Sequence, residues 1–141
     1  MLRSTLALAV FAAVCLPAFA EGDAAADRQS VMSNVGKVTK LGAAMAKEEA
    51  PFDAATAEAV FRTLNNAALG FGYMFPEGSQ TGSDTEASPK IWEDRAGFDA
   101  QVAKFVADTT PVPATLDEFK TAFGTATQNC GACHENWRVK N

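Results

Sequence analysis

Histidine and cysteine are scarce in this chain of 141 residues, which holds one histidine, His134, and three cysteines. A structural zinc site takes about four nitrogen or sulfur ligands. Cys130 and Cys133, together with His134, offer three at most, and Cys15 is far away in the sequence. The scarcity therefore argues against a zinc site and leaves few residues for any other metal centre.

Long apolar runs are also absent, because a bilayer span takes about 20 residues and the run from Leu6 to Leu16 is too short. This run lies between a short basic start and the A-x-A motif Ala18-Phe19-Ala20. That order is typical of a secretory signal peptide. We therefore expect residues 1–20, with Cys15, to be removed on export, and residues 21–141 to form a protein that does not insert into the membrane.

Basic residues are in the minority. Removal of Arg3 with the signal peptide leaves 11 Lys and Arg against 17 Asp and Glu, a net charge of −6. Nucleic acids and anionic membranes call for clustered basic residues, so we expect neither as a partner. Residues 21–141 have the length of one domain and show no internal repeat.

Apolar residues recur at helical spacing, and no segment shows the alternation of a strand. Asp53 is a candidate N-cap, Ser88-Pro89 places proline in a first turn, and Thr115 with Glu118 forms a capping box. These signals and the prolines predict helices over residues 24–48, 53–71, 88–110 and from 115 onward, with a polar loop over 74–87. The sequence therefore predicts an all-α fold, an antiparallel up-down-up-down four-helix bundle, which is a fold that builds cofactor sites between facing helices.

The last predicted helix carries the clearest stripe, with spacings of four and three that are typical of a buried seam. Its members are Leu116, Phe119, Phe123, Ala126, Cys130, Cys133 and Trp137. At about 100° per residue, Cys130, Cys133 and His134 fall within an arc of roughly 100°. One face of one helix therefore presents two thiols and an imidazole to the bundle interior.

Cys130-Gly131-Ala132-Cys133-His134 is the C-x-x-C-H signature of a c-type haem. The two thiols form thioethers with one porphyrin, and the adjacent imidazole is its proximal iron ligand. A thioredoxin-like C-x-x-C is expected near a βαβ pattern, which is missing here. We therefore expect one covalent haem c through Cys130 and Cys133, with His134 on the iron. An exported haem protein of this kind belongs in the bacterial periplasm.

Several segments resemble the cytochrome c prime family across essentially all of residues 21–141. They are Arg28-Gln29-Ser30, Phe75 to Ser79, Ser88 to Trp92, and the C-x-x-C-H motif followed four residues after its histidine by Arg138. Ala44 to Lys47 and Pro51 to Asp53 are similar to the low-spin branch, cytochrome c-556. The resemblance implies a four-helix bundle with one haem. Members of the family commonly form dimers through their first two helices, so the resemblance is compatible with a homodimer, and the sequence leaves monomer and dimer open.

The resemblance implies a sixth iron ligand as well. High-spin members cover the distal side of the haem with an apolar side chain, commonly leucine, whereas in the cytochrome c-556 branch a methionine of the first helix binds the iron. The matching residue is Met32, and Met/His ligation raises the haem potential. Periodicity alone also allows Met32 to be a residue that only packs in the core. Met45 and Met74 are the other methionines of residues 21–141, and so the other candidates for the sixth ligand.

Three polar residues are candidates for holding the haem by the same resemblance. Arg28 lies one helical turn before Met32, and the equivalent arginine of the family pairs with a haem propionate, although an arginine here is also compatible with a solvated surface position. Gln29 has the neighbouring family position. Arg138 lies one turn after His134 and is expected near the imidazole or a propionate, although a cation there also complements the helix dipole.

Aromatic residues are expected to serve packing. Trp92 and Trp137 are expected to pack against the haem or the helix core, and Tyr73 and Phe75 are expected in the core beside the loop. None of them has a predicted chemical role.

Two classes of function stay open. The first is a mono-haem electron carrier with His/Met-ligated iron, which serves unidentified redox partner proteins. The second is a five-coordinate haem protein that binds nitric oxide or carbon monoxide. An enzyme such as a peroxidase is disfavoured, because no second histidine exists to act as a distal acid–base group.

Overall fold

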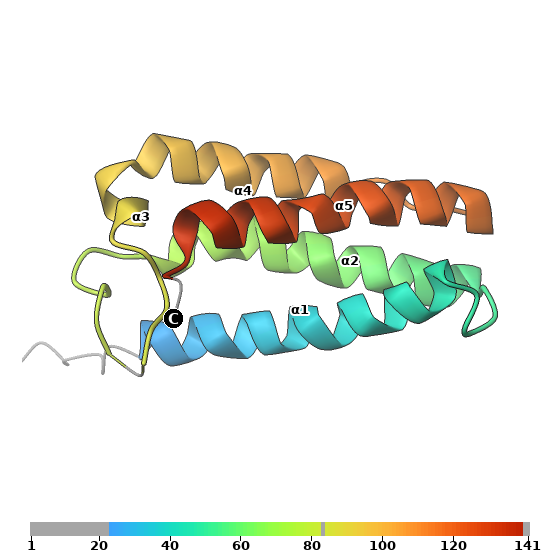
Figure 1. The fold of residues 1–141 in the computed structure, drawn as a ribbon, viewed down its shortest axis with the longest axis horizontal. Coiled ribbons are helices and arrows are strands. Elements are labelled where there is room, and N and C mark those ends of the chain that lie inside the picture. Colours follow the sequence, from blue (N-terminus) through green and yellow to red (C-terminus); the bar gives the residue numbers. More distant parts are fainter. Residues whose placement is uncertain (1–22, 83, 140–141) are drawn as a thin grey trace, which may run out of the picture.

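Four long helices form most of the protein in the computed structural model, which describes residues 23–82 and 84–139 (Figure 1). They are α1 (Ala24–Ala46), α2 (Ala54–Phe71), α4 (Arg95–Thr109) and α5 (Leu116–Trp137). A 3-10 turn, η1 (Gly72–Met74), extends α2, and a short helix, α3 (Lys90–Glu93), precedes α4. The predicted signal peptide, residues 1–20, lies outside the described residues.

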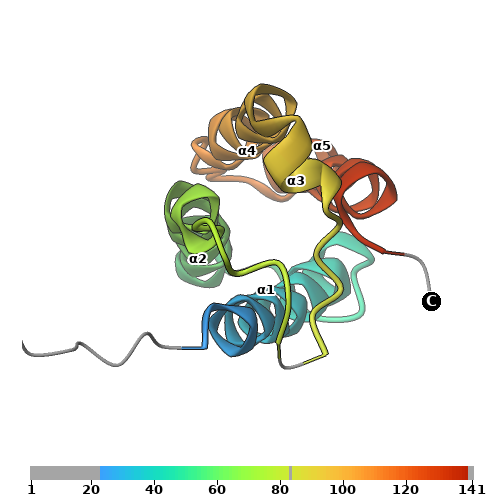
Figure 2. The same cartoon turned by 90° about the vertical axis from the view of Figure 1, so that its left-hand side faces the viewer.

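Each long helix runs antiparallel to the next along the chain, as Figure 1 shows. Seen from the end in Figure 2, the helices surround a common axis in the order α1, α2, α4 and α5. The described residues contain no strand, and a single isolated bridge pairs Ala87 with Arg138. The predicted all-α, up-down-up-down four-helix bundle is therefore confirmed.

No helix within residues 23–82 or 84–139 combines the length and the apolar character that a membrane crossing requires.

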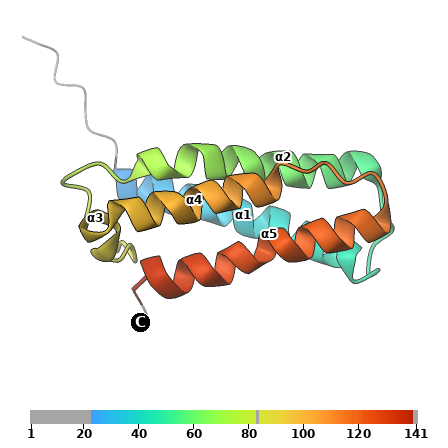
Figure 3. The ribbon, with the colours of Figure 1, turned by 90° about the horizontal axis from the view of Figure 1, so that it is seen from above.

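The helix starts follow the capping signals of the sequence. The Asp53 carboxylate accepts the backbone N–H of Thr56 at 2.8 Å and so begins α2. Both halves of the capping box at the start of α5 are present: the Glu118 N–H donates to Thr115 Oγ1, and the Thr115 N–H donates to Glu118 Oε2, each at 3.3 Å. Between α4 and α5, residues 110–115 form neither helix nor strand and lead to the far end of the bundle (Figure 3).

The prediction of a single helix over residues 88–110 is wrong in one respect, because the structure has two helices there, divided at Asp94. Asp94 leaves the helical conformation, with φ −125° and ψ 63°, and its carboxylate accepts the Gly97 N–H at 3.0 Å. An aspartate that bonds backbone N–H groups in this way competes with helix continuation and favours a cap. Asp94 therefore ends α3 and starts α4.

Two clusters of buried side chains form the core, one toward each end of the bundle. The first contains Val35, Met45, Ala57, Val60, Phe61, Leu64, Phe119, Phe123 and Ala126. The second contains Phe75, Ile91, Phe98 and Trp137, with Trp92 and Cys133 packed against it. The predicted stripe of α5 contributes to both clusters. Within the second, the Phe98 and Trp137 rings meet edge to face with 5.6 Å between their centroids.

The expectation that Tyr73 lies in the core is wrong, since its side chain is 87% exposed. Phe71 and Phe75 take the inward positions on either side of it, and their rings meet edge to face with 5.1 Å between centroids. The residue midway between them, in the tight turn η1, points outward. Phe75 itself is buried, as expected.

Candidate haem-binding site

A cavity of about 610 Å³ opens inside the bundle, bounded by α1, α4, α5, the end of α2 and residues 85–87. Its volume falls in the range of about 300–1,000 Å³ that is usual for ligand and cofactor sites. Apolar side chains form much of its wall, among them Val35, Phe71, Phe98, Val102 and Phe105. The cavity is therefore suited to a large, flat and mostly apolar group.

The C-x-x-C-H motif lines this cavity from α5. Cys130 and Cys133 are half-buried on the wall, and His134 is more exposed at the rim. Burial raises the pKa of both thiols. The pKa of Cys133 is raised to about 11, and the neighbouring Cys130 adds to the shift of Cys133. The structure thus brings the three residues together on one helix face, as the spacing predicts.

The surroundings of His134 favour the form of imidazole that binds iron. Burial is the main cause that lowers its pKa; Arg138 lowers it further, and Glu86 opposes the shift. A neutral imidazole is the form in which histidine ligates a metal. Two thiols and an imidazole on the wall of a cavity of this size fit haem c.

Met32 lines the same cavity from α1, half-buried. Met45 lies in the first core cluster, 2% exposed, and Met74 packs against the second cluster. Among the described residues, neither of these two lines the cavity. Met32 also packs against the first core cluster, so its position serves both as cavity wall and as packing.

Arg28 is buried, 5% exposed, and its guanidinium holds the loop between α2 and α3. Nη1 donates to Met74 O at 2.9 Å and to Ser79 Oγ at 3.1 Å. Nη2 donates to Ser79 O at 2.9 Å and to Thr85 Oγ1 at 3.2 Å, and the guanidinium also lies over the Phe75 ring. Arg28 lines the cavity too, and its pairing with a propionate stays a prediction.

Gln29 and Arg138 also line the cavity, and both contact the same loop. Gln29 Nε2 donates to Asp84 O at 3.5 Å, and Arg138 Nε donates to Glu86 Oε2 at 2.5 Å. The backbone adds two hydrogen bonds beside Arg138, from Ser88 N to Trp137 O and from Val139 N to Glu86 O. The end of α5 is therefore tied to the loop one turn after His134.

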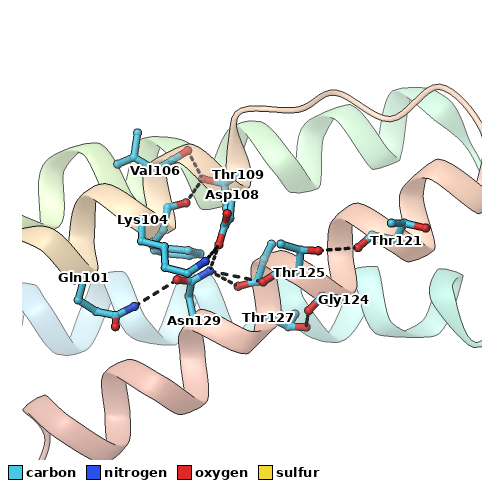
Figure 4. Close-up of polar contacts among 12 residues, drawn as sticks. Gln101, Lys104, Val106, Asp108, Thr109, Thr121, Gly124, Thr125, Thr127 and Asn129 are labelled. Carbon is cyan, nitrogen blue, oxygen red and sulfur yellow. Dashed lines mark hydrogen bonds and ion pairs between the residues drawn. The ribbon is translucent and has the colours of Figure 1, made fainter.

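A polar network that the sequence analysis missed joins α4 to α5 through Asn129, the residue before Cys130 (Figure 4). Asn129 is 3% exposed; its Oδ1 accepts from Gln101 Nε2 at 3.1 Å and its Nδ2 donates to Asp108 Oδ2 at 2.7 Å. Asp108 also pairs with Lys104. Asn129 stands at helical spacing from Ala126 and Cys133, so a signal existed: a polar residue on the buried face of the last helix.

No group of three His, Cys, Asp or Glu side chains in residues 23–82 and 84–139 is arranged to hold a metal ion by itself. The fold and the site define the class of this protein, which is a c-type cytochrome built on a four-helix bundle. Its last helix carries the attachment motif and faces the bundle cavity.

Comparisons with known proteins identify the family. The family model described as Cytochrome C' matches residues 23–138. Cytochrome c' of Rhodopseudomonas palustris is 37% identical over 126 residues, 87% of this chain and 86% of that protein. Cytochrome c-556 of Agrobacterium fabrum is 34% identical over 143 residues, 99% of this chain and 97% of that protein. A solved structure of cytochrome c' from Rhodopseudomonas palustris superimposes with a TM-score of 0.79 at 36% identity, and the match covers 84% of this chain and 98% of that chain.

The chain belongs to the cytochrome c' family. Its cofactor is haem c, which this family binds covalently through cysteines, here Cys130 and Cys133. Members of the family are haem-binding electron carriers or gas-binding proteins.

Proposed function

We propose that this protein is a mono-haem electron carrier of the periplasm in which His134 and Met32 ligate the iron. The observation that supports this is the shared cavity: the C-x-x-C-H motif lines it from α5, and Met32 lines it from α1. A thioether and an imidazole are the ligand pair of the electron-carrying cytochromes c. Met45 and Met74 have no comparable place on the wall.

Haem c held in this way supplies a one-electron ferric–ferrous couple. Cys130 and Cys133 would fix the group to α5. His134 would supply the imidazole ligand; partial burial and then the positive charge of Arg138 lower its pKa, against the effect of Glu86, and so favour the neutral form that binds iron. Apolar side chains form much of the wall, and with Met32 as a second ligand the iron would have no open position for a substrate. We propose no catalytic role.

A five-coordinate protein that binds nitric oxide or carbon monoxide is the second candidate. Met32 packs against the first core cluster, so it also has a structural reason to be there. Relatives named cytochrome c' and cytochrome c-556 match at similar identity, 37% and 34%. Sequence identity to these relatives therefore favours neither the cytochrome c' nor the cytochrome c-556 branch. Whether Met32 binds the iron distinguishes the two candidate functions.

Optical spectra of the purified holoprotein and of Met32→Leu test the proposal. Leucine conserves the volume of methionine, and such a swap usually costs less than about 1.5 kcal/mol, so the variant should fold. We expect a low-spin wild type, a high-spin variant, a lower potential, and faster binding of carbon monoxide to the ferrous variant.

Met45→Leu is the matched control, since it makes the same change in the core and away from the cavity wall; we expect it to stay low-spin. A wild type that is already high-spin would favour the gas-binding candidate. A low-spin Met32→Leu would show that another residue is the sixth ligand.

Export and assembly complete the proposal. Intact mass of the periplasmic form should correspond to residues 21–141 with one haem, and a lipid-bearing chain that begins at Cys15 would contradict it. Sedimentation of the same sample tests for a homodimer, and a monomer at all concentrations would exclude it.

A further inference from the structure

Gly42 marks a close approach of α1 to α5. It is buried, and a Cβ atom at this position would lie 2.4 Å from Phe123 Cε2 and 2.8 Å from Phe123 Cζ. Carbon atoms in contact prefer separations of about 3.5–4.0 Å. Any side chain at residue 42 therefore requires α1 and Phe123 to separate by about 1 Å or more.

The backbone of Gly42 does not require glycine. Gly42 is part of the regular helix α1, and the glycines with positive φ among the described residues are Gly78 and Gly82. Alanine is the better helix former. The close contact with Phe123, and not conformation, is what requires the absence of a side chain.

The ring of Phe123 is held in place by its neighbours. It is 6% exposed and stacks on Phe119, with 5.3 Å between ring centroids and 15° between the ring planes. Phe119 is fully buried and meets Phe61 edge to face with 5.9 Å between centroids. Because this aromatic group cannot turn aside without disturbing the first core cluster, a side chain at residue 42 displaces α1.

A displacement of α1 reaches the cavity. Met32 lies ten residues before Gly42 on the same 23-residue helix, about 15 Å along its axis. Met32, Gly36 and Thr39 line the cavity between these points. A shift of about 1 Å is large for a ligand that must hold a fixed bond length.

We propose that Gly42 is a positioning residue for the sixth iron ligand: its missing side chain lets α1 lie against Phe123 and so places Met32 within reach of haem bound on α5. The inference rests on the proposed Met32 ligation. It assigns a role to Gly42, which lies far from the C-x-x-C-H motif in the sequence and contacts α5 at Phe123.

The test is Gly42→Ala in the holoprotein, read by its optical spectrum and by the rate at which the ferrous form binds carbon monoxide. A misplacement of about 1 Å can cost about two orders of magnitude at an active site. We therefore expect a partly high-spin spectrum and carbon monoxide binding at least about tenfold faster than in the wild type. A variant with wild-type spectrum and rate would overturn the inference.

Gly124→Ala is the matched control, because it adds the same methyl group to α5 next to Phe123 where no atom lies within 4 Å. We expect it to behave as the wild type. The double variant Gly42→Ala/Phe123→Leu removes the ring atoms that clash and should return the spectrum to low-spin, with Phe123→Leu alone as its reference. If Gly42→Ala alone does not accumulate as folded protein, the double variant decides the test. A double variant that is high-spin, beside a Phe123→Leu variant that is low-spin, would refute the inference.

Met32→Leu, measured in parallel, separates the two hypotheses. If Met32→Leu stays low-spin, the proposed ligation itself is wrong. If Met32→Leu becomes high-spin while Gly42→Ala matches Gly124→Ala, the ligation stands and only the role of Gly42 is refuted.

Discussion

Replacement of Arg28 by methionine should loosen the loop between α2 and α3 without unfolding the bundle. Methionine keeps an apolar stem of similar length, but it removes the four hydrogen bonds from the guanidinium to Met74, Ser79 and Thr85. A typical hydrogen bond contributes about 0.5–1.5 kcal/mol net, and bonds that share one donor group are not additive. We expect the free energy of unfolding to fall by about 2–4 kcal/mol.

The measurements are urea unfolding and thermal melting of the holoprotein, with amide hydrogen exchange over residues 76–86. A loss of this size should lower the Tm by roughly 10–20 °C in a domain of this length, and exchange in the loop should quicken more than in α2 or α5. Arg28→Lys keeps the charge but cannot reproduce the forked set of bonds, so its loss should be intermediate.

Arg62→Met is the control for Arg28→Met. Arg62 is exposed and forms a surface ion pair with Glu58 on the same helix, a contact worth about 0–1 kcal/mol. If Arg28→Met is no less stable than Arg62→Met, or if it shifts the haem potential while loop exchange stays at the wild-type rate, the loop-holding role of Arg28 is refuted. The second outcome would favour the predicted propionate pairing.

Three further predictions concern the last helix and its neighbour. Alanine at both Cys130 and Cys133 should leave no haem bound to the chain after denaturation, and retained covalent haem would contradict attachment through these thiols. Asn129→Leu removes the partner that Gln101 and Asp108 share, so urea unfolding should show a loss of about 1–3 kcal/mol; an unchanged midpoint would show that the network adds nothing. Lys104 first, and then Asn129, hold the pKa of Asp108 below its usual value. A carboxylate whose pKa is depressed by folding stabilises the protein above its unfolded pKa and loses that contribution as the pH falls through the folded value. Thermal melts of Asp108→Asn should therefore decline less than those of the wild type below about pH 4, and equal declines would argue against the pKa shift.

The long helices could be predicted from the sequence because their signals are local. Asp53 and Thr115 bond backbone groups within three residues, and the apolar spacing of α5 decides which face it buries. Asp94 also acts locally, yet it was missed, because an aspartate within an apolar helical pattern is equally compatible with a continuous helix. The direction of Tyr73 depends on a single tight turn, which periodicity does not resolve.

The site divides in the same way. The C-x-x-C-H motif is visible because its three functional residues lie within five positions of the sequence, and the structure places them on one cavity wall with Met32 on another. The partners of Arg28 lie 46 to 57 residues along the chain, beyond the reach of any spacing argument. Gly42 shows the same limit, since nothing in its own helix indicates that Phe123 lies against it.

The loop of residues 74–88 connects these observations to the haem. Arg28 holds it from α1, and Arg138 with the backbone of α5 holds it from the other side through Glu86 and Ser88. A guanidinium has five N–H groups, and the four bonds of Arg28 to the loop leave at most one for a propionate while the loop stays in place. Since Phe75 and residues 85–87 line the cavity, the loop is itself part of the wall. The contacts that the structure shows for both arginines are contacts with this loop, so we expect a change in either to quicken amide exchange in the loop.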